Sequence, residues 1–165
     1  MKSVYLCGFM GCGKSTIGRI IAKKCGCGFV DMDDYIVERE GMSIPQIFAE
    51  KGEKYFRDTE TAAIRELAEK CAVIACGGGA MLKKENAEIA SESGIVVYID
   101  VPFEECYGRI AGDTNRPLVM NNSKEKLEEI YNGRVPVYRD NSSVTADGSG
   151  GADEVADRII EAIRY

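Results

Sequence analysis

Eight residues near the start of the chain have the types and spacing needed to hold a phosphate group. Gly8-Phe9-Met10-Gly11-Cys12-Gly13-Lys14-Ser15 matches the pattern Gly-x-x-x-x-Gly-Lys-[Ser/Thr]. The glycines let backbone N–H groups approach phosphate oxygens, and a following helix adds the positive end of its dipole. In this pattern Lys14 reaches the β- and γ-phosphates of a nucleoside triphosphate, and the Ser15 hydroxyl is a Mg²⁺ ligand. The alternative is a glycine-rich turn without a ligand, which the flanking strand and helix patterns disfavour.

Cys12 lies inside this loop, beside Lys14 and a predicted helix N-terminus, and these surroundings favour a reactive thiol. One hypothesis is an oxidisable thiol whose modification blocks nucleotide binding. The other, favoured from position alone, is that Cys12 fills a variable position of the loop. The chain has 7 cysteines, no histidine and no Cys-x-x-Cys pair, so neither a disulfide framework nor a zinc site is expected. Cys7, Cys71 and Cys76 lie in or beside apolar runs and are predicted to be small buried hydrophobes.

Two carboxylates follow the second predicted strand, at Asp31 and Asp33. They could hold Mg²⁺, directly or through water, and could accept a proton from a hydroxyl substrate. The alternative is a solvated acidic helix start, which the helix dipole also favours. The phosphate-binding loop favours the functional interpretation.

Three other features contain residues that could take part in ligand binding or phosphoryl transfer. Arg57 lies on a predicted helix, where it could equally be a surface residue paired with a neighbouring acid. Gly77-Gly78-Gly79 follows a buried strand, where it could let a small ligand approach the backbone. Arg109 and Arg116 flank a polar, turn-rich segment, and a lid arginine neutralises charge in phosphoryl transfer. The alternative for both is an arginine in solvent.

Strands and helices alternate along the chain, which predicts an α/β fold with a parallel sheet and helices on both faces. Continuous apolar runs are typical of buried parallel strands. Five strands are expected, at 3–7, 28–31, 71–76, 95–99 and 143–146. Helices are expected at 15–25, about 53–70, 84–91, 102–110, around 127–131 and at 155–163, and a capping box is expected at 43–46. Residues 112–122 are expected to form a mobile loop, and Pro136 is expected to disturb its helix.

Length and composition set limits on the function. With 165 residues the chain is predicted to be one domain, 1–165, and its net charge of −6 argues against a nucleic-acid-binding surface. There is no apolar run of 18 residues and no signal-peptide pattern, so no membrane contact and a cytoplasmic location are expected. A monomer is expected.

Taken together, the motifs resemble those of shikimate kinases, a family within the nucleoside monophosphate kinase-like P-loop group. The resemblance spans nearly the full length. Each motif is weak alone, but their order and spacing are specific. The matching segments are Gly8 to Thr16, Asp31 with Asp33, Phe56 to Glu60, Gly77 to Gly79, Arg116 to Leu118, and Arg134 with Tyr138.

The resemblance implies a three-layer α/β/α fold with a central five-stranded parallel sheet, of the P-loop kinase type. It also implies a reaction, transfer of the γ-phosphate of ATP to the 3-hydroxyl of shikimate with Mg²⁺, in aromatic amino acid biosynthesis. The acceptor-binding region would be about 33–61. By this analogy Asp33 binds the shikimate hydroxyls and acts as, or positions, the base. Arg57 and Arg134 would hold the carboxylate, and Gly78 and Gly79 would line the pocket.

For the nucleotide, the resemblance implies that Arg116 closes over the phosphates with a lid at about 112–122 and that Arg109 packs against adenine. Lys14 and Arg116 would join Asp33 in catalysis. Ser15 and Asp31 would bind the metal. Asp31 would replace the usual Walker B acid, which is missing after the strand at 71–76. The ATP-binding residues would be Gly11, Cys12, Gly13, Lys14, Ser15, Thr16, Arg109 and Arg116. The segment 147–151 is richer in glycine than the family pattern, so no adenine contact is assigned there.

Two other functions stay open from the sequence. Arg57 and Arg134 would suit any small carboxylate, so gluconate or another small metabolite could be the phosphate acceptor. A nucleotide-binding module without turnover is the second alternative, although Lys14, Asp33 and Arg116 argue for a working kinase. A GTPase is disfavoured because the chain has no Asn-Lys-x-Asp motif.

Overall fold

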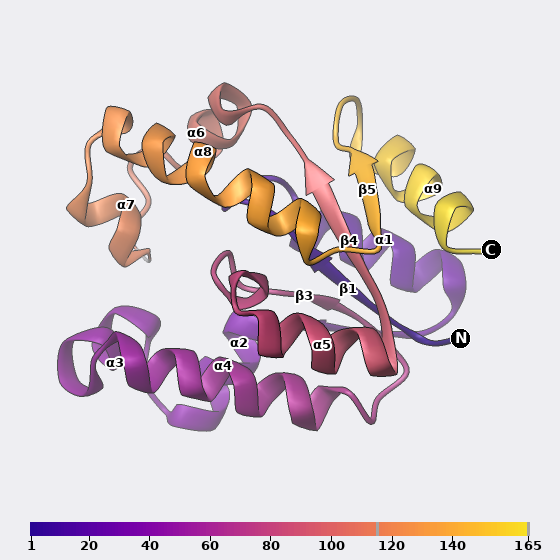
Figure 1. Ribbon diagram of the computed structural model, residues 1–165, viewed down its shortest axis with the longest axis horizontal. Helices are drawn as coiled ribbons and strands as arrows, with labels where there is room; N and C mark the ends of the chain where they lie inside the picture. The colour runs from indigo at the N-terminus through magenta and orange to yellow at the C-terminus, as the bar shows by residue number, and fades with distance from the viewer. Residues whose placement is uncertain (115, 165) are drawn as a thin grey trace.

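The computed structural model describes residues 1–114 and 116–164. Within these residues the chain forms one parallel sheet of five strands in the order β2-β3-β1-β4-β5, with helices on both faces (Figure 1). This confirms the predicted α/β architecture. The strands are β1 (Ser3–Cys7), β2 (Gly28–Asp31), β3 (Ala72–Ala75), β4 (Gly94–Asp100) and β5 (Val144–Asp147). The helices are α1 (Lys14–Cys25), α2 (Met32–Glu40), α3 (Ile44–Lys51), α4 (Glu53–Leu67), η1 (Ala80–Leu82), α5 (Lys84–Ser93), α6 (Phe103–Ile110), α7 (Pro117–Asn121), α8 (Lys124–Asp140) and α9 (Ala152–Ile163).

The central strand β1 is buried on both faces, as its continuous apolar run predicts. Leu6 faces α1, where Gly18 comes close enough that a Cβ there would lie 3.3 Å from Leu6 Cδ1. Tyr5 points to the other face, where its hydroxyl lies 2.7 Å from the Ser93 hydroxyl of α5. On that face the ring of Tyr138 from α8 stacks on Tyr98 of β4. Helices α1 and α9 pack together on the face of Leu6.

The carboxyl ends of the strands point toward one end of the molecule. Figure 1 shows α3 and α7 at this end, with the two chain termini at the opposite end. In open parallel sheets ligands bind at the carboxyl ends of the strands. The loops after β1, β2 and β3, which carry the phosphate-loop, Asp31–Asp33 and Gly77–Gly79 segments, therefore meet at one place.

Two predictions about local structure were wrong. Residues 117–121 form the short helix α7 inside the segment predicted as a loop, with Pro117 in its first turn and Asn122 Nδ2 donating to the Leu118 carbonyl. Helix α8 continues through Pro136 to Asp140. Its two ends are anchored by buried side chains, Leu127 before the proline and Tyr138 after it, and this packing offsets the lost backbone hydrogen bond.

Smaller differences lie at element ends. Helix α4 ends at Leu67 rather than near Lys70, and α6 starts after Pro102, which is its N-cap. Cys71 precedes β3 and is exposed, whereas Cys7 and Cys76 are buried as predicted. The predicted capping box at Ser43 is present, with Gln46 as its partner. No helix of the described residues is long and apolar enough to cross a membrane.

Candidate active site

The loop between β1 and α1 has the geometry of a phosphate-binding site. Gly13 is the N-cap of α1 in the left-handed region, with φ of 95°, a conformation that glycine adopts without strain. No side chain caps this end, and the first turn carries no acid. The free N–H groups and the dipole of α1 therefore present positive charge to an anion.

Lys14 and Ser15 stand at the start of the same helix. Lys14 Nζ donates to the carbonyls of Gly8, at 2.7 Å, and of Phe9, at 3.2 Å, so the ammonium group lies over the loop. The Ser15 hydroxyl donates to Asp31 Oδ2 at the end of β2. Asp31 Oδ1 meanwhile accepts from the backbone N–H of Asp33, at 3.1 Å, and so caps α2.

The pairing of Ser15 with Asp31 fits the chemistry of Mg²⁺. The described residues contain no cluster of three or more acidic, cysteine or histidine side chains that could hold a metal by itself. Mg²⁺ at nucleotide sites uses one or two protein oxygens together with waters and phosphates. A hydroxyl and a carboxylate that meet beside the phosphate loop supply such a donor set.

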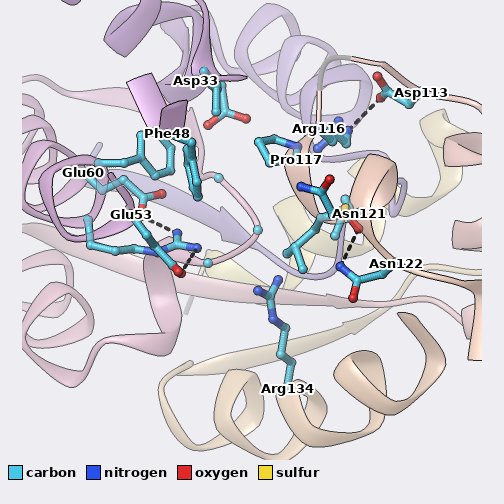
Figure 2. Close-up of a pocket in the computed structure, with 18 of the residues that line it drawn as sticks. Asp33, Phe48, Glu53, Glu60, Asp113, Arg116, Pro117, Asn121, Asn122 and Arg134 are labelled. Carbon is cyan, nitrogen blue, oxygen red and sulfur yellow. Dashed lines mark hydrogen bonds and ion pairs between the residues drawn. The ribbon is translucent and has the colours of Figure 1, made fainter. Parts of the chain in front are cut away.

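Two cavities adjoin at this end of the sheet. The smaller, of about 160 Å³, lies over the phosphate loop and is lined by Lys14, Ser15 and Thr16 among others. The larger, of about 440 Å³, lies among α2, α3, α4, α7 and α8 and is drawn in Figure 2. Five residues line both cavities: Asp31, Asp33, Gly77, Gly78 and Arg116. A phosphate on the loop and a small molecule in the larger cavity would therefore meet at Asp33.

Asp33 stands on α2 at the junction of the two cavities. Burial and the nearby Asp31 carboxylate raise its pKa, while Arg116 and Lys14 oppose that shift. A carboxylate with raised proton affinity is better suited to accept a proton from a hydroxyl group. Gly77 makes room for it, since a Cβ on Gly77 would lie 2.8 Å from Asp33 Oδ1.

Arg57, on α4, forms one wall of the larger cavity. Its Nη1 donates to Glu60 Oε1 at 2.7 Å, and its Nη2 lies 3.5 Å from Glu53 Oε1. The guanidinium group rests against the glycine turn, so closely that a Cβ on Gly79 would be 2.2 Å from Nη1. These contacts fix a cation on this wall of the cavity.

Glu60 is the buried member of this group. Its side chain is 1% exposed, and Oε2 has no hydrogen-bond partner among the described residues. Burial raises the pKa of Glu60 to about 7, although Arg57 opposes that shift. A Cβ on Gly77 would be 3.0 Å from Glu60 Oε2, so this oxygen and Asp33 Oδ1 converge above Gly77.

A second arginine reaches the cavity from α8. Figure 2 shows Arg134 pointing into the cavity from a different side than Glu53 and Glu60. Its Nη1 lies close to the glycine turn, 3.6 Å from where a Cβ on Gly78 would be. One turn further along α8, the Tyr138 hydroxyl donates to the Gly78 carbonyl, so the helix that carries Arg134 is tied to the turn.

Arg116 lies in the segment predicted as a lid, directly before α7. Its Nε lies 3.0 Å from Asp113 Oδ2, and Figure 2 shows this pair at the edge of the cavity near Pro117. Pro117 and Leu118 join Ile44, Phe48 and Phe56 as the apolar part of the cavity lining. A lining that combines charged and apolar groups suits a small ring that bears a carboxylate and hydroxyl groups.

Two of the predicted nucleotide residues lie outside both cavities. Arg109 of α6 is exposed, and its Nη1 donates to the Gly11 carbonyl at 2.7 Å, which places it at the rim of the phosphate loop. Cys12 is buried, and its thiol lies 3.7 Å from Lys14 Nζ. Burial favours the packing interpretation of Cys12 over an accessible, oxidisable thiol.

Comparison with known proteins agrees with this geometry. The model of a family described as shikimate kinase matches residues 10–164. A shikimate kinase of Persephonella marina is 45% identical over 139 residues, which cover 84% of each chain. The chain belongs to the shikimate kinase family.

Solved structures lead to the same family. A shikimate kinase from Acinetobacter baumannii, in complex with shikimate, superposes with a TM-score of 0.94 at 38% identity, covering 99% of this chain and 93% of that one. A gluconokinase from Sinorhizobium meliloti covers 98% of this chain and 91% of its own, with a TM-score of 0.58 at 17% identity, which is a likeness of fold alone. The predicted resemblance is thereby confirmed, and with it the prediction that the chain is a kinase.

Sequence reasoning assigned no role to Glu60, Glu53 or Asp113. Glu60 lies three residues after Arg57, a spacing that a sequence shows equally for any surface ion pair. Its burial depends on how α4 packs against α2 and lies beside the glycine turn, which local pattern does not reveal. The one available signal was the Phe56–Glu60 motif itself.

Proposed function

We propose that this protein transfers the γ-phosphate of ATP to the 3-hydroxyl of shikimate, giving shikimate 3-phosphate and ADP. Family membership supports the reaction. The single observation that carries it to these residues is the position of Asp33. It stands where the phosphate cavity meets a cavity that is lined by Arg57 of α4 and Arg134 of α8.

The larger cavity is proposed to bind the acceptor. Arg57 and Arg134 take its carboxylate through charge-assisted hydrogen bonds, and the backbone of Gly78 and Gly79 lines the ring. These contacts turn one hydroxyl toward Asp33 and the phosphate loop. Asp33 then orients that hydroxyl for in-line attack and takes its proton as the new O–P bond forms.

The smaller cavity is proposed to hold the phosphates of ATP. Backbone N–H groups of residues 11–16 and the Lys14 ammonium bind the β- and γ-phosphates, and Arg116 adds positive charge where the γ-phosphate is transferred. Ser15 and Asp31 would hold Mg²⁺, which when bound neutralises phosphate charge. Arg109, at the rim of the loop, is proposed to pack against adenine.

Motion of the lid at about 112–122, of which residue 115 lies outside the described residues, is proposed to exclude water so that ATP is not hydrolysed without an acceptor. The chain is proposed to act as one catalytic domain, as a monomer in the cytoplasm. The acceptor-binding region is proposed to be about 33–61.

The test is ADP release with Mg-ATP, measured by a coupled assay with shikimate, with gluconate and with no acceptor. Turnover that depends on shikimate is expected. Turnover with gluconate alone would make the protein a different small-metabolite kinase. ATP binding without turnover on either acid would favour a nucleotide-binding module.

A further inference from the structure

Arg116 is held by a carboxylate of its own segment. Asp113 lies three residues earlier, and its Oδ2 accepts from Arg116 Nε at 3.0 Å. Both side chains are partly exposed, at 31% for Asp113 and 39% for Arg116. Exposed ion pairs contribute little to stability, so the energy of folding does not explain this contact.

The contact uses one particular nitrogen of the guanidinium group. A bond to Nε leaves both terminal nitrogens of Arg116 available as a fork, the arrangement that matches two oxygens of a phosphate. Arg116 lines both cavities, whereas Asp113 lines only the acceptor cavity. Asp113 therefore contacts Arg116 away from the phosphate cavity.

The backbone of Arg116 is fixed as well. Its carbonyl accepts from the N–H groups of Val119 and Met120, both at 3.1 Å, so the residue is the N-cap of α7. With one end of the side chain anchored by α7 and Nε anchored by Asp113, the remaining rotamer freedom of a long side chain is reduced. Because this freedom is already lost before the reaction, less conformational entropy is lost when the transition state forms.

A carboxylate beside a site for ATP phosphates also has an unfavourable effect. Its charge repels the phosphates and competes with them for Arg116. The two effects have opposite signs. Orientation predicts that removing Asp113 slows catalysis, whereas competition predicts that removing it strengthens nucleotide binding.

We propose that Asp113 is a positioning residue for phosphoryl transfer. It holds Arg116 by Nε so that the two terminal nitrogens face the γ-phosphate over the phosphate loop. This inference rests on the proposed role of Arg116 at the phosphates.

The experiment compares Asp113→Ala, Asp113→Asn, Arg116→Ala and the double variant Asp113→Ala/Arg116→Ala. Readouts are kcat, the KM values for Mg-ATP and shikimate, and the Kd of Mg-AMPPNP by calorimetry. Glu129→Ala is the matched control, because Glu129 pairs with Lys126 at the same spacing, at 3.4 Å, away from both cavities. Thermal unfolding of each variant checks that the fold is intact.

Asp113→Ala should lower kcat about tenfold and change the shikimate KM by less than about twofold, since the misplaced group serves the phosphates. Asp113→Asn should retain most of the activity, because an amide oxygen still accepts from Nε. The effect of Asp113→Ala should vanish when Arg116 is already alanine.

Wild-type kcat in Asp113→Ala would overturn the inference, as would equal losses in the alanine and asparagine variants. A loss of the same size in the Arg116→Ala background would show that Asp113 acts elsewhere. Tighter Mg-AMPPNP binding by Asp113→Ala, without loss of kcat, would make Asp113 a competitor instead. If the wild type itself shows no shikimate-dependent turnover, the proposed function fails. The inference is then judged by Mg-AMPPNP binding, which Asp113→Ala should weaken because a misplaced Arg116 no longer meets the γ-phosphate; unchanged or tighter binding would overturn it.

Discussion

Replacing Gly79 by alanine should damage acceptor binding while leaving the fold intact. The backbone at Gly79 has φ of −99°, which any residue adopts, so alanine introduces no backbone strain. The added Cβ would lie 2.2 Å from Arg57 Nη1, 2.7 Å from Cζ and 2.8 Å from Nη2. The guanidinium group must therefore retreat, and because it ends a flexible side chain it can do so.

The size of the effect follows from these distances. Ordinary contact between heavy atoms begins near 3.5 Å, so the guanidinium group must move by more than about 1 Å. Such a shift removes the bond that Arg57 is proposed to make with the shikimate carboxylate. A hydrogen bond to a charged group contributes about 1.5–3 kcal/mol, and a tenfold change in binding corresponds to about 1.4 kcal/mol. The shikimate KM should rise roughly 10- to 100-fold, with the KM for Mg-ATP nearly unchanged.

Steady-state kinetics with varied shikimate measure this effect, and thermal unfolding monitors the fold. Gly133→Ala is the matched control, because Gly133 lies on α8 and a Cβ there meets nothing within 4 Å. An unchanged shikimate KM in Gly79→Ala would show that the position of Arg57 does not control acceptor binding. A large loss of stability would show that the turn has no room to adjust.

Four further results are expected. Asp33→Asn should abolish turnover and leave ATP binding nearly intact, and normal turnover would remove it as the base. Arg116→Ala should lower kcat far more than it raises the shikimate KM, whereas the opposite pattern would move Arg116 to the acceptor. Glu53→Gln should lower the shikimate KM a few-fold, because Glu53 competes for Arg57 at 3.5 Å; a higher KM would instead mean that Glu53 orients the arginine. Glu60 has its pKa raised by burial to about 7 from an ordinary 4.5, so the folded state holds this proton more tightly. The free energy of unfolding should therefore fall as pH rises between about 4.5 and 7, and Glu60→Gln should flatten that part of the denaturation profile.

Much of the fold could be predicted from sequence because its signals are local. Continuous apolar runs identified the strands, and the glycines around Lys14 identified the phosphate loop. Helix α7 escaped prediction because five residues carry too little pattern to distinguish a helix from a turn. The prediction that Pro136 disturbs its helix failed for the opposite reason. The local penalty of the proline is overridden by the packing of Tyr138 against Tyr98 and Gly78, which are distant from it in sequence.

For the site, the sequence predicted which residues come together but not what surrounds each of them. Ser15 and Asp31 were expected to serve one metal, and the structure brings their side chains together. Asp33, Arg57, Gly78, Gly79 and Arg134 were expected to serve one ligand, and all line one cavity. Their roles in catalysis stay predictions. The surroundings of each group could not be predicted, because the burial of Glu60 and the pairing of Arg116 depend on how the segments pack.

The hydrogen bond from Tyr138 to Gly78 has a consequence for how the molecule responds to its ligand. It ties α8, which carries Arg134, to the glycine turn, so these two segments should move together. Arg57 belongs to α4, on another wall. A carboxylate bound by both arginines would link α4 to α8 and the glycine turn. Amide hydrogen exchange in α4 and α8 should then slow together when the acceptor binds, although the two helices are far apart in the chain. Acceptor binding would thus reduce the local motion of the helices on both sides of the larger cavity.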